Sequence, residues 1–204
     1  MHADGPRLLN EDRDRTVAME ALLLTPAVPL DELTHRSPGA YVLLYRGDLP
    51  LYELARRPRG RTDLRSISEA GGAPIYVGAA TSLAERRGRH EKNLAPCSDI
   101  GDDDLLAVAL PTSSVAGAFY IERLLMATFR PVWNEPFVSG FGSKPQGASR
   151  TRHQRVPRWS VLHPGRHRSV AATDAGHRRR LQQQVVDHLN RTVNDALRVA
   201  MPER

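Results

Sequence analysis

The sequence predicts an α+β fold in which a small antiparallel sheet is flanked by helices. Three short runs of β-forming residues alternate with helical patterns in the order strand, strand, helix, strand, helix. One further helical pattern near each end adds an N-terminal helical arm and a C-terminal helix. Because a chain of 204 residues can bury roughly 70% of its unfolded surface, we expect one compact domain with extensions.

The first half of the chain predicts the helical arm and two paired strands. A helical pattern over Leu8–Leu24 ends before Pro26, because proline disfavours a helical conformation in the residue before it. Ala40–Tyr45 and Pro74–Gly78 are rich in β-forming residues and bounded by glycine or proline, so we expect two strands that pair. The segment Gly47–Gly72 between them is longer than a hairpin turn needs and is rich in arginine. It predicts an insertion in the hairpin.

A helix and a third strand follow. Thr81 or Ser82 is placed to cap a helix over Leu83–Leu94, and Glu85 stands three residues after Ser82 as in a capping box. Leu105–Leu110 is a continuous apolar run that predicts a buried strand.

Two more helices complete the pattern. Ser113 or Ser114 starts a helix that continues through Phe129. The chain is then punctuated by glycine and proline, which predicts irregular structure. From His177 to Ala200 apolar residues return at helical spacing. This helix is expected to pack on the domain, with pairing in a dimer as the alternative.

The charge of the chain points to a polyanionic partner. The net charge is +6, from 29 Lys and Arg against 23 Asp and Glu. The excess is concentrated in residues 140–170, a stretch without any acidic residue. A nucleic-acid backbone is the simplest partner for such a tract, and an ordinary solvated basic surface is the alternative.

Composition also indicates the cellular compartment of the protein. Cys97 is the only cysteine, which excludes an intrachain disulfide or a cluster of thiolate metal ligands. The sequence contains no apolar segment of the roughly 20 residues needed to span a bilayer. We therefore expect a cytoplasmic protein that does not act in a membrane.

Three segments form a linked pattern of reactive side chains. The first is Gly39-Ala40-Tyr41, the second is Ile75-Tyr76-Val77-Gly78 followed by Arg86 and His90, and the third runs from Glu122 to Asn134. Arg86 and His90 are four residues apart and therefore share one face of the predicted helix. Glu122 is the only acidic residue between Asp104 and Glu135, which makes its carboxylate the natural ligand for a hard divalent ion such as Mg²⁺ (or Mn²⁺).

The order and spacing of these elements resemble the core of the GIY-YIG nuclease superfamily. Ala40 replaces the usual isoleucine of the first triplet, and Ala79 stands where relatives often have lysine or serine. The resemblance implies a nuclease domain over residues 1–204. Its catalytic core would cover about 38–136, its basic DNA-contacting tract about 140–170 and its C-terminal helix about 177–200.

The same resemblance implies roles for the site residues. Tyr41 would be the general base that activates water, with Tyr76 beside it, and His90 would exchange a proton with a tyrosine. Whether Tyr41 or His90 finally accepts the proton is left open. Arg86 would hold the scissile phosphate through its planar fork, while its neighbours Arg87 and Arg89 are expected on the surface or on the DNA backbone. Glu122 would bind the metal ion, and Asn134 would anchor the site by hydrogen bonds to backbone or phosphate.

The tail after the core resembles one branch of the superfamily. Phe141-Gly142-Ser143-Lys144-Pro145-x-Gly147, and later the run from Trp159 to Arg166, are similar to the type II restriction endonucleases that cut CCGCGG. That branch implies a homodimer on double-stranded DNA and a cognate DNA methyltransferase in the host. The alternatives are a homing or repair nuclease, or an inactive DNA-binding protein with this fold.

The residues expected to contact DNA are all basic and come from the insertion and from the tract after Asn134. They are Arg56, Arg57, Arg59, Arg61, Arg65, Lys144, Arg150, Arg152, Arg155, Arg158 and Arg166. Arginine can bind the O6 and N7 atoms of guanine together, which suits a GC-rich site.

Overall fold

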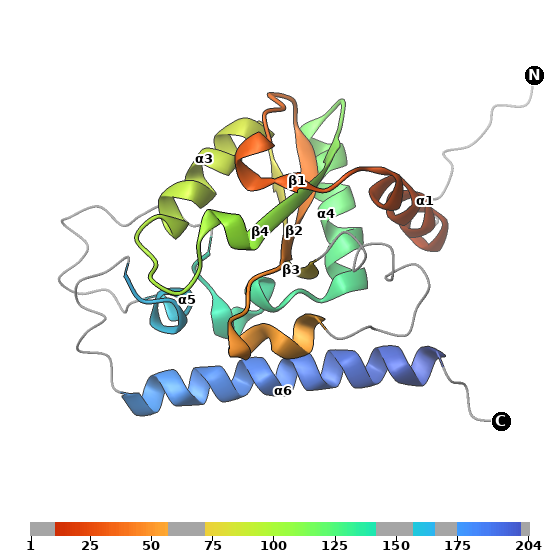
Figure 1. Ribbon diagram of the computed structural model, residues 1–204. Coiled ribbons are helices and arrows are strands. Elements are labelled where there is room, and N and C mark those ends of the chain that lie inside the picture. Colours follow the sequence, from red (N-terminus) through yellow and green to blue (C-terminus); the bar gives the residue numbers. More distant parts are fainter. Residues whose placement is uncertain (1–10, 57–71, 142–156, 166–174, 201–204) are drawn as a thin grey trace, which may run out of the picture.

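The computed structural model describes residues 11–56, 72–141, 157–165 and 175–200 (Figure 1). The strands are β1 (Val28–Pro29), β2 (Gly39–Tyr45), β3 (Ala73–Ala80) and β4 (Leu105–Pro111). The α-helices are α1 (Glu11–Leu24), α3 (Leu83–Leu94), α4 (Val115–Phe129), α5 (Arg158–Leu162) and α6 (Ala175–Ala200). Short 3₁₀ helices are η1 (Leu30–Glu32), η2 (Pro50–Arg56), η3 (Asp102–Asp104), η4 (Val132–Asn134) and η5 (Pro136–Val138).

The structure confirms the predicted α+β class. The four strands form an antiparallel sheet in the order β1-β4-β2-β3. The two strands with the tyrosine motifs pair as expected, with Tyr41 opposite Gly78 and Leu43 opposite Tyr76. The third predicted strand, β4, pairs with the other edge of β2. The two-residue strand β1 was not predicted.

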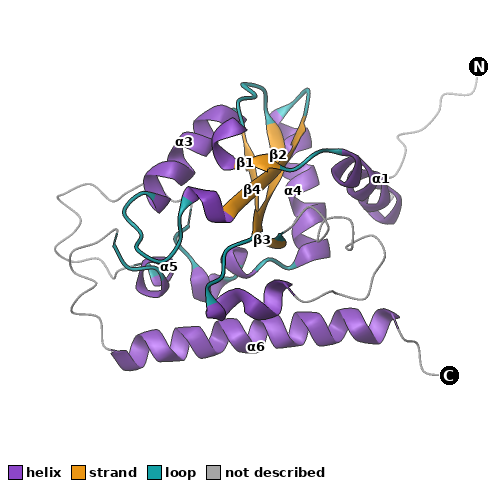
Figure 2. Cartoon of the chain, viewed as in Figure 1, coloured by secondary structure: helices purple, strands orange, loops and turns teal. Residues whose placement is uncertain are grey.

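Both faces of the sheet are covered (Figure 2). Ala40, Val42 and Leu44 of β2 share a buried cluster with side chains of α1 and α4. The alternate residues Tyr41 and Leu43 face a second cluster, which includes side chains of α3, α5 and α6. The central strand is therefore buried on both sides, which explains why its sequence is apolar without interruption.

Capping side chains set the starts of α3 and α4. Ser82 Oγ accepts a hydrogen bond from the Glu85 N–H at 3.4 Å, and Ser114 Oγ accepts one from the Gly117 N–H at 3.1 Å. Each serine was one of the two caps expected for its helix. Arg130 ends α4 in the left-handed conformation, with φ of 47°.

The C-terminal helix α6 packs on the domain. Figure 1 shows it alongside η2, the first part of the predicted insertion. Leu181, Val185 and Leu189 are buried along its inner face, and His188 Nε2 bonds to the Arg130 carbonyl at 2.9 Å. None of the helices among the described residues is long and apolar enough to cross a membrane.

One expectation about the tail was wrong. The tract after Asn134 was expected to be irregular, yet Arg158–Leu162 forms the short helix α5. Trp159 and Val161 are buried against the core, and this tertiary contact stabilises a helix that is too short to form alone.

We predict that truncating Leu189 destabilises the whole chain. Leu189→Ala removes a side chain that is 1% exposed, and the cavity should lower the free energy of unfolding by about 2–4 kcal/mol. Urea denaturation, followed by circular dichroism, should show one transition, as expected for a single domain. The control is Gln184→Ala on the exposed face of α6. If both variants changed stability equally, the packing of α6 on the domain would be contradicted.

Candidate active site

Four of the predicted catalytic side chains lie together on one face of the sheet. Tyr41 Oη and His90 Nε2 are 2.6 Å apart. Arg86 donates from Nε to Tyr41 Oη and from Nη2 to Tyr76 Oη, both at 2.9 Å. One guanidinium therefore binds both phenols, and the first phenol is also bonded to an imidazole.

The local structure explains this arrangement. Because Tyr41 pairs with Gly78, Tyr41 and Tyr76 are diagonal neighbours on the same face of the sheet. Arg86 and His90 are one turn apart on α3, which packs over that face. A Cβ atom at Gly78 would lie 2.5 Å from Tyr41 Oη. Only glycine at this position leaves room for the Tyr41 ring to cross the neighbouring strand.

Glu122 and Asn134 bind the backbone of β3 from its open edge. Glu122 Oε1 accepts a hydrogen bond from the Ala79 N–H at 3.0 Å. Asn134 accepts from the Val77 N–H and donates to the Val77 carbonyl, both at 2.8 Å. Since β3 is an edge strand of the described sheet, these side chains occupy positions where another strand could pair. Asn134 was expected to bond to backbone or to phosphate, and the structure shows the bonds to backbone.

A cavity of about 330 Å³ adjoins this cluster. Arg86 and Glu122 both line it, so a guanidinium and a carboxylate face the same space. The rest of its lining comes from Ala79, Ala80, Thr81, Ser82, Glu85, Arg89 and Phe119. Tyr41, which is fully buried, is connected to the cavity through its hydrogen bond with Arg86.

The Tyr41 and His90 pair is neutral at physiological pH. Burial and the adjacent Tyr76 raise the pKa of Tyr41 well above its ordinary value, although Arg86 opposes this shift. Burial, together with Arg86 and Arg89, lowers the pKa of His90 to about 3. The phenol therefore retains its proton, and the imidazole is able to accept one.

The Tyr41 phenol can both accept and donate a hydrogen bond. Its oxygen accepts from Arg86 Nε, and with the Nδ1–H tautomer of the neutral imidazole the phenol hydrogen is donated to His90 Nε2. A neutral imidazole that accepts at Nε2 carries its own proton at Nδ1. Within the described part of the chain, that buried Nδ1 has no hydrogen-bond partner.

Arg86 and Glu122 bring a positive and a negative charge to the cavity. The pKa of Arg86 is raised by the two phenols against the opposing effect of burial, so the guanidinium remains charged. Burial raises the pKa of Glu122, whereas the Ala79 N–H and Arg86 favour its ionised form. A bound cation would favour the carboxylate further.

The donor set fits a hard divalent cation. Mg²⁺ prefers oxygen ligands, retains several water molecules and is commonly held by one or two carboxylates together with a substrate phosphate. Glu122 offers a carboxylate in a cavity that also contains a phosphate-binding guanidinium. Among the residues that the structure describes, no group of three His, Cys, Asp or Glu side chains forms a protein-only metal site.

The arginines next to Arg86 have different environments. Arg87 forms an ion pair with Glu91 at 3.2 Å and donates to the Asp31 carbonyl, in accord with the expected surface position. Arg89 lines the cavity together with Arg86. The helical spacing did not single out Arg89, because a three-residue step from Arg86 is equally common between residues on an exposed helix face.

Phe141 is a site residue that the spacing of reactive side chains could not identify. Its ring stacks on His90 with a centroid distance of 4.7 Å and an interplanar angle of 8°. It also meets the Tyr76 ring edge-on, at 5.0 Å. The sequence indicated Phe141 only as part of the tail pattern, whereas the structure places it against the imidazole.

Two of the residues expected to contact DNA belong to the described part of the chain. Arg158 is exposed on α5, and Arg56 is the last residue of η2. The others lie outside the described residues, namely Arg57, Arg59, Arg61, Arg65, Lys144, Arg150, Arg152, Arg155 and Arg166.

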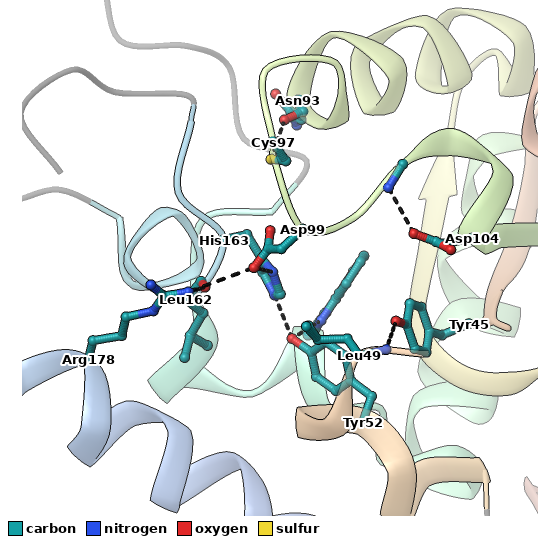
Figure 3. Close-up of polar contacts among 12 residues, drawn as sticks. Tyr45, Leu49, Tyr52, Asn93, Cys97, Asp99, Asp104, Leu162, His163 and Arg178 are labelled. Atoms are coloured by element: carbon teal, nitrogen blue, oxygen red, sulfur yellow. Dashed lines mark hydrogen bonds and ion pairs between the residues drawn. The ribbon is translucent and has the colours of Figure 1, made fainter. Parts of the chain in front are cut away.

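A second buried tyrosine and histidine pair lies away from the cavity (Figure 3). Tyr52 Oη and His163 Nε2 are 2.6 Å apart, and His163 Nδ1 is 3.2 Å from Asp99 Oδ2. Trp133 Nε1 donates to Tyr52 Oη at 2.9 Å. The side chain of Arg178 approaches Asp99 at 3.8 Å. This network joins η2, the loop after α3, η4, α5 and α6, so it stabilises the position of the tail.

The comparison with known families matches a segment that contains part of this site. The family described as the Eco29kI GIY-YIG domain matches residues 83–192, more than half of the chain. The matched segment contains Arg86, His90, Glu122 and Asn134, while both tyrosine motifs precede it. No curated protein matches the chain.

We predict that Asn134 is required for stability. Asn134→Ala leaves the N–H and the carbonyl of the buried Val77 without their side-chain partner. The free energy of unfolding should fall by about 2–6 kcal/mol, since each of the two unsatisfied buried groups costs about 1–3 kcal/mol. Chemical denaturation measures the change. Asn190→Ala, at an exposed position on α6, should have little effect, and an equally small effect of Asn134→Ala would contradict the prediction.

We also predict that acid destabilises the chain through its buried histidines. Burial lowers the pKa of His163 despite the adjacent Asp99, so the unfolded chain binds more protons below the ordinary pKa of about 6.5. Stability contributed by neutral His163 is therefore present above this pH and is lost as the pH falls, at up to about 1.4 kcal/mol per pH unit.

Melting curves between pH 7.5 and 5 test this linkage. His163→Asn removes the titrating ring, and its melting temperature should change less with pH than that of the wild type. His35→Asn is the control because His35 is exposed, and it should keep the wild-type pH dependence. Identical pH dependence in all three proteins would contradict the prediction.

Proposed function

The chain belongs to the GIY-YIG family described by the Eco29kI domain, and from this membership we propose that it is a site-specific endonuclease for double-stranded DNA. The supporting observation is that Arg86 and Glu122 line one cavity while Arg86 also binds both phenols. A phosphodiester in this cavity would meet a guanidinium and a carboxylate, and the proposed proton acceptors are connected to the guanidinium by hydrogen bonds. Hydrolysis of a phosphodiester requires these groups together.

We propose that Tyr41 and His90 transfer the proton of the attacking water. Tyr41 is protonated in the resting site, so it can accept the water proton only as it donates its own proton to His90 Nε2, 2.6 Å away. His90 is neutral and accepts at that nitrogen. The positive charge formed on the imidazole is opposed by Arg86 and Arg89, and the negative charge of a bound phosphate would offset this cost.

Arg86 and Glu122 would have different roles at the phosphate. Arg86, with Arg89 in the same cavity, would bind the non-bridging oxygens and stabilise the charge that develops on them. Glu122 would hold Mg²⁺ or Mn²⁺, which supplies Lewis acidity to the phosphate when it is bound. The Ala79 N–H fixes one Glu122 oxygen and so orients the carboxylate. Since this contact is made by the backbone, it does not depend on the side chain at position 79.

The finer proposal is a type II restriction enzyme that cuts a CCGCGG-like palindrome. Its support is the likeness of the tail pattern, in which Phe141 stacks on His90 and His163 belongs to the second tyrosine and histidine pair. A palindrome has two-fold symmetry, so a homodimer with one active site per strand would cut both strands. A host that makes such an enzyme needs a cognate methyltransferase to protect the same sequence in its own DNA.

The presence of the whole site weighs against an inactive DNA-binding protein. Tyr41, Tyr76, Arg86 and His90 are connected by hydrogen bonds or ring contacts, and Glu122 shares a cavity with Arg86. Binding to DNA alone would require none of this chemistry.

We predict Mg²⁺-dependent cutting of a plasmid that contains one CCGCGG sequence. The purified chain should produce a single linear product, and EDTA should prevent cutting. A plasmid that differs only by a base change within that sequence should stay intact. Gel electrophoresis and sequencing of the ends provide the readout. An intact first plasmid would contradict the endonuclease proposal, whereas equal cutting of both would contradict only the proposed specificity.

Glu122→Gln is the decisive variant for the proposed metal ligand. It should lower the cutting rate about a thousandfold or more, because a bound metal ion supplies several kcal/mol of charge stabilisation. Duplex binding in a gel-shift assay should remain near the wild-type level. Glu20→Gln, at an exposed position on α1, is the matched control and should cut normally. A Glu122→Gln protein that cuts at the wild-type rate would remove Glu122 as the ligand.

A further inference from the structure

Phe119 is a large apolar side chain in a cavity that also holds charged side chains. It lines the cavity with Arg86, Arg89 and Glu122, and 55% of its surface is exposed. Phe119 lies three residues before Glu122, so the ring and the carboxylate are neighbours on the surface of α4. A large exposed aromatic ring beside charged side chains indicates a contact that the free chain does not make.

Phe119 belongs to an apolar stripe along the exposed side of α4. Val115, Phe119 and Met126 are exposed by 36%, 55% and 36%, and with Glu122 they follow a four, three, four spacing that keeps them on one helix face. The core of the domain does not need this face, because Leu125 and Phe129 of α4 are the residues buried against the sheet. Apolar side chains of α4 are therefore exposed on both sides of Glu122, the proposed metal ligand.

We propose that Phe119 packs against the deoxyribose of the nucleotide joined to the scissile phosphate, an inference that rests on the proposed endonuclease function. A phosphodiester is bonded to a deoxyribose on each side, so apolar sugar carbons always accompany its charged oxygens. With the phosphate held by Arg86 and Glu122, an adjoining sugar would lie beside the ring that shares their cavity. The contact would position the phosphate and exclude water from one side of it.

The lining of the cavity favours DNA over a second copy of the chain. Arg86 and Arg89 attract an anion into the space that Phe119 borders. A ligand for this cavity must therefore be anionic where it meets the arginines and apolar where it meets the ring. A nucleotide in duplex DNA has both properties in adjoining groups, whereas a second copy of the chain would need an acidic side chain directly beside an apolar one.

Three variants test the contact in a cleavage assay with a labelled duplex and Mg²⁺. Phe119→Ala should lower kcat/KM about tenfold, because roughly half of the burial energy of a phenylalanine is lost. Phe119→Leu should keep most of the activity, since an aliphatic side chain can also pack on a sugar. Val17→Ala is the matched control, because Val17 is also 55% exposed but lies on α1. It should cut like the wild type.

Two further measurements separate the contact from other effects. The melting temperature should change little in Phe119→Ala, because the ring is already more than half exposed. The Mg²⁺ concentration that gives half-maximal rate should stay the same. A large shift in that concentration would indicate that Phe119 acts through the placement of Glu122, and would overturn the proposed sugar contact.

The remaining outcomes distinguish this inference from the proposed function. A wild-type chain that cuts no duplex overturns both. A wild-type chain that cuts, with Phe119→Ala equally active, overturns only the sugar contact. Equal losses in Phe119→Leu and Phe119→Ala would indicate stacking on a base, which also overturns it. If sedimentation showed that Phe119→Ala converts a dimer to a monomer, the stripe would be a protein interface instead.

Discussion

The open edge of β3 is the constraint on which both the fold and the candidate site depend. An edge strand presents unpaired N–H and carbonyl groups that must be satisfied or covered. Asn134 and Glu122 bind the groups of Val77 and Ala79, so the side chains that satisfy the edge also surround the site. Because Tyr76 precedes Val77 on β3 and Glu122 bonds to Ala79 of the same strand, a displacement of β3 would move the phenol and the Glu122 carboxylate together.

The chain contains two buried tyrosine and histidine pairs, and their surroundings give them different roles. In both, the phenol oxygen and the imidazole Nε2 are 2.6 Å apart, and a third side chain donates to the phenol oxygen. For Tyr52 that donor is the neutral Trp133, and Asp99 accepts from the far side of His163, so this network joins segments of the fold. For Tyr41 the donor is the charged Arg86, which also faces the cavity. The charge and the access to a ligand distinguish the proposed catalytic pair from the structural one.

The sequence was sufficient for the order of the elements, because apolar periodicity, glycine and proline boundaries and serine caps act locally. It also grouped the proposed site residues, since the four-residue step from Arg86 to His90 fixes one helix face. Contacts between distant segments could not be predicted in the same way. The stacking of Phe141 on His90 and the formation of α5 depend on how the tail folds back on the core. Phe119 carries no reactive group, so only its exposure beside Glu122 indicates a role.

The burial of His90 determines its part in the proposed proton transfer. Leaving a buried donor unsatisfied costs about 1–3 kcal/mol, and the described part of the chain provides no partner for Nδ1. A carboxylate at that position, like the one beside His163, would remove the cost, but it would raise the pKa of His90 and favour its charged form. A charged imidazole could not accept the Tyr41 proton. Burial, together with Arg86 and Arg89, keeps His90 neutral, so the imidazole is able to accept the proton in the proposed step.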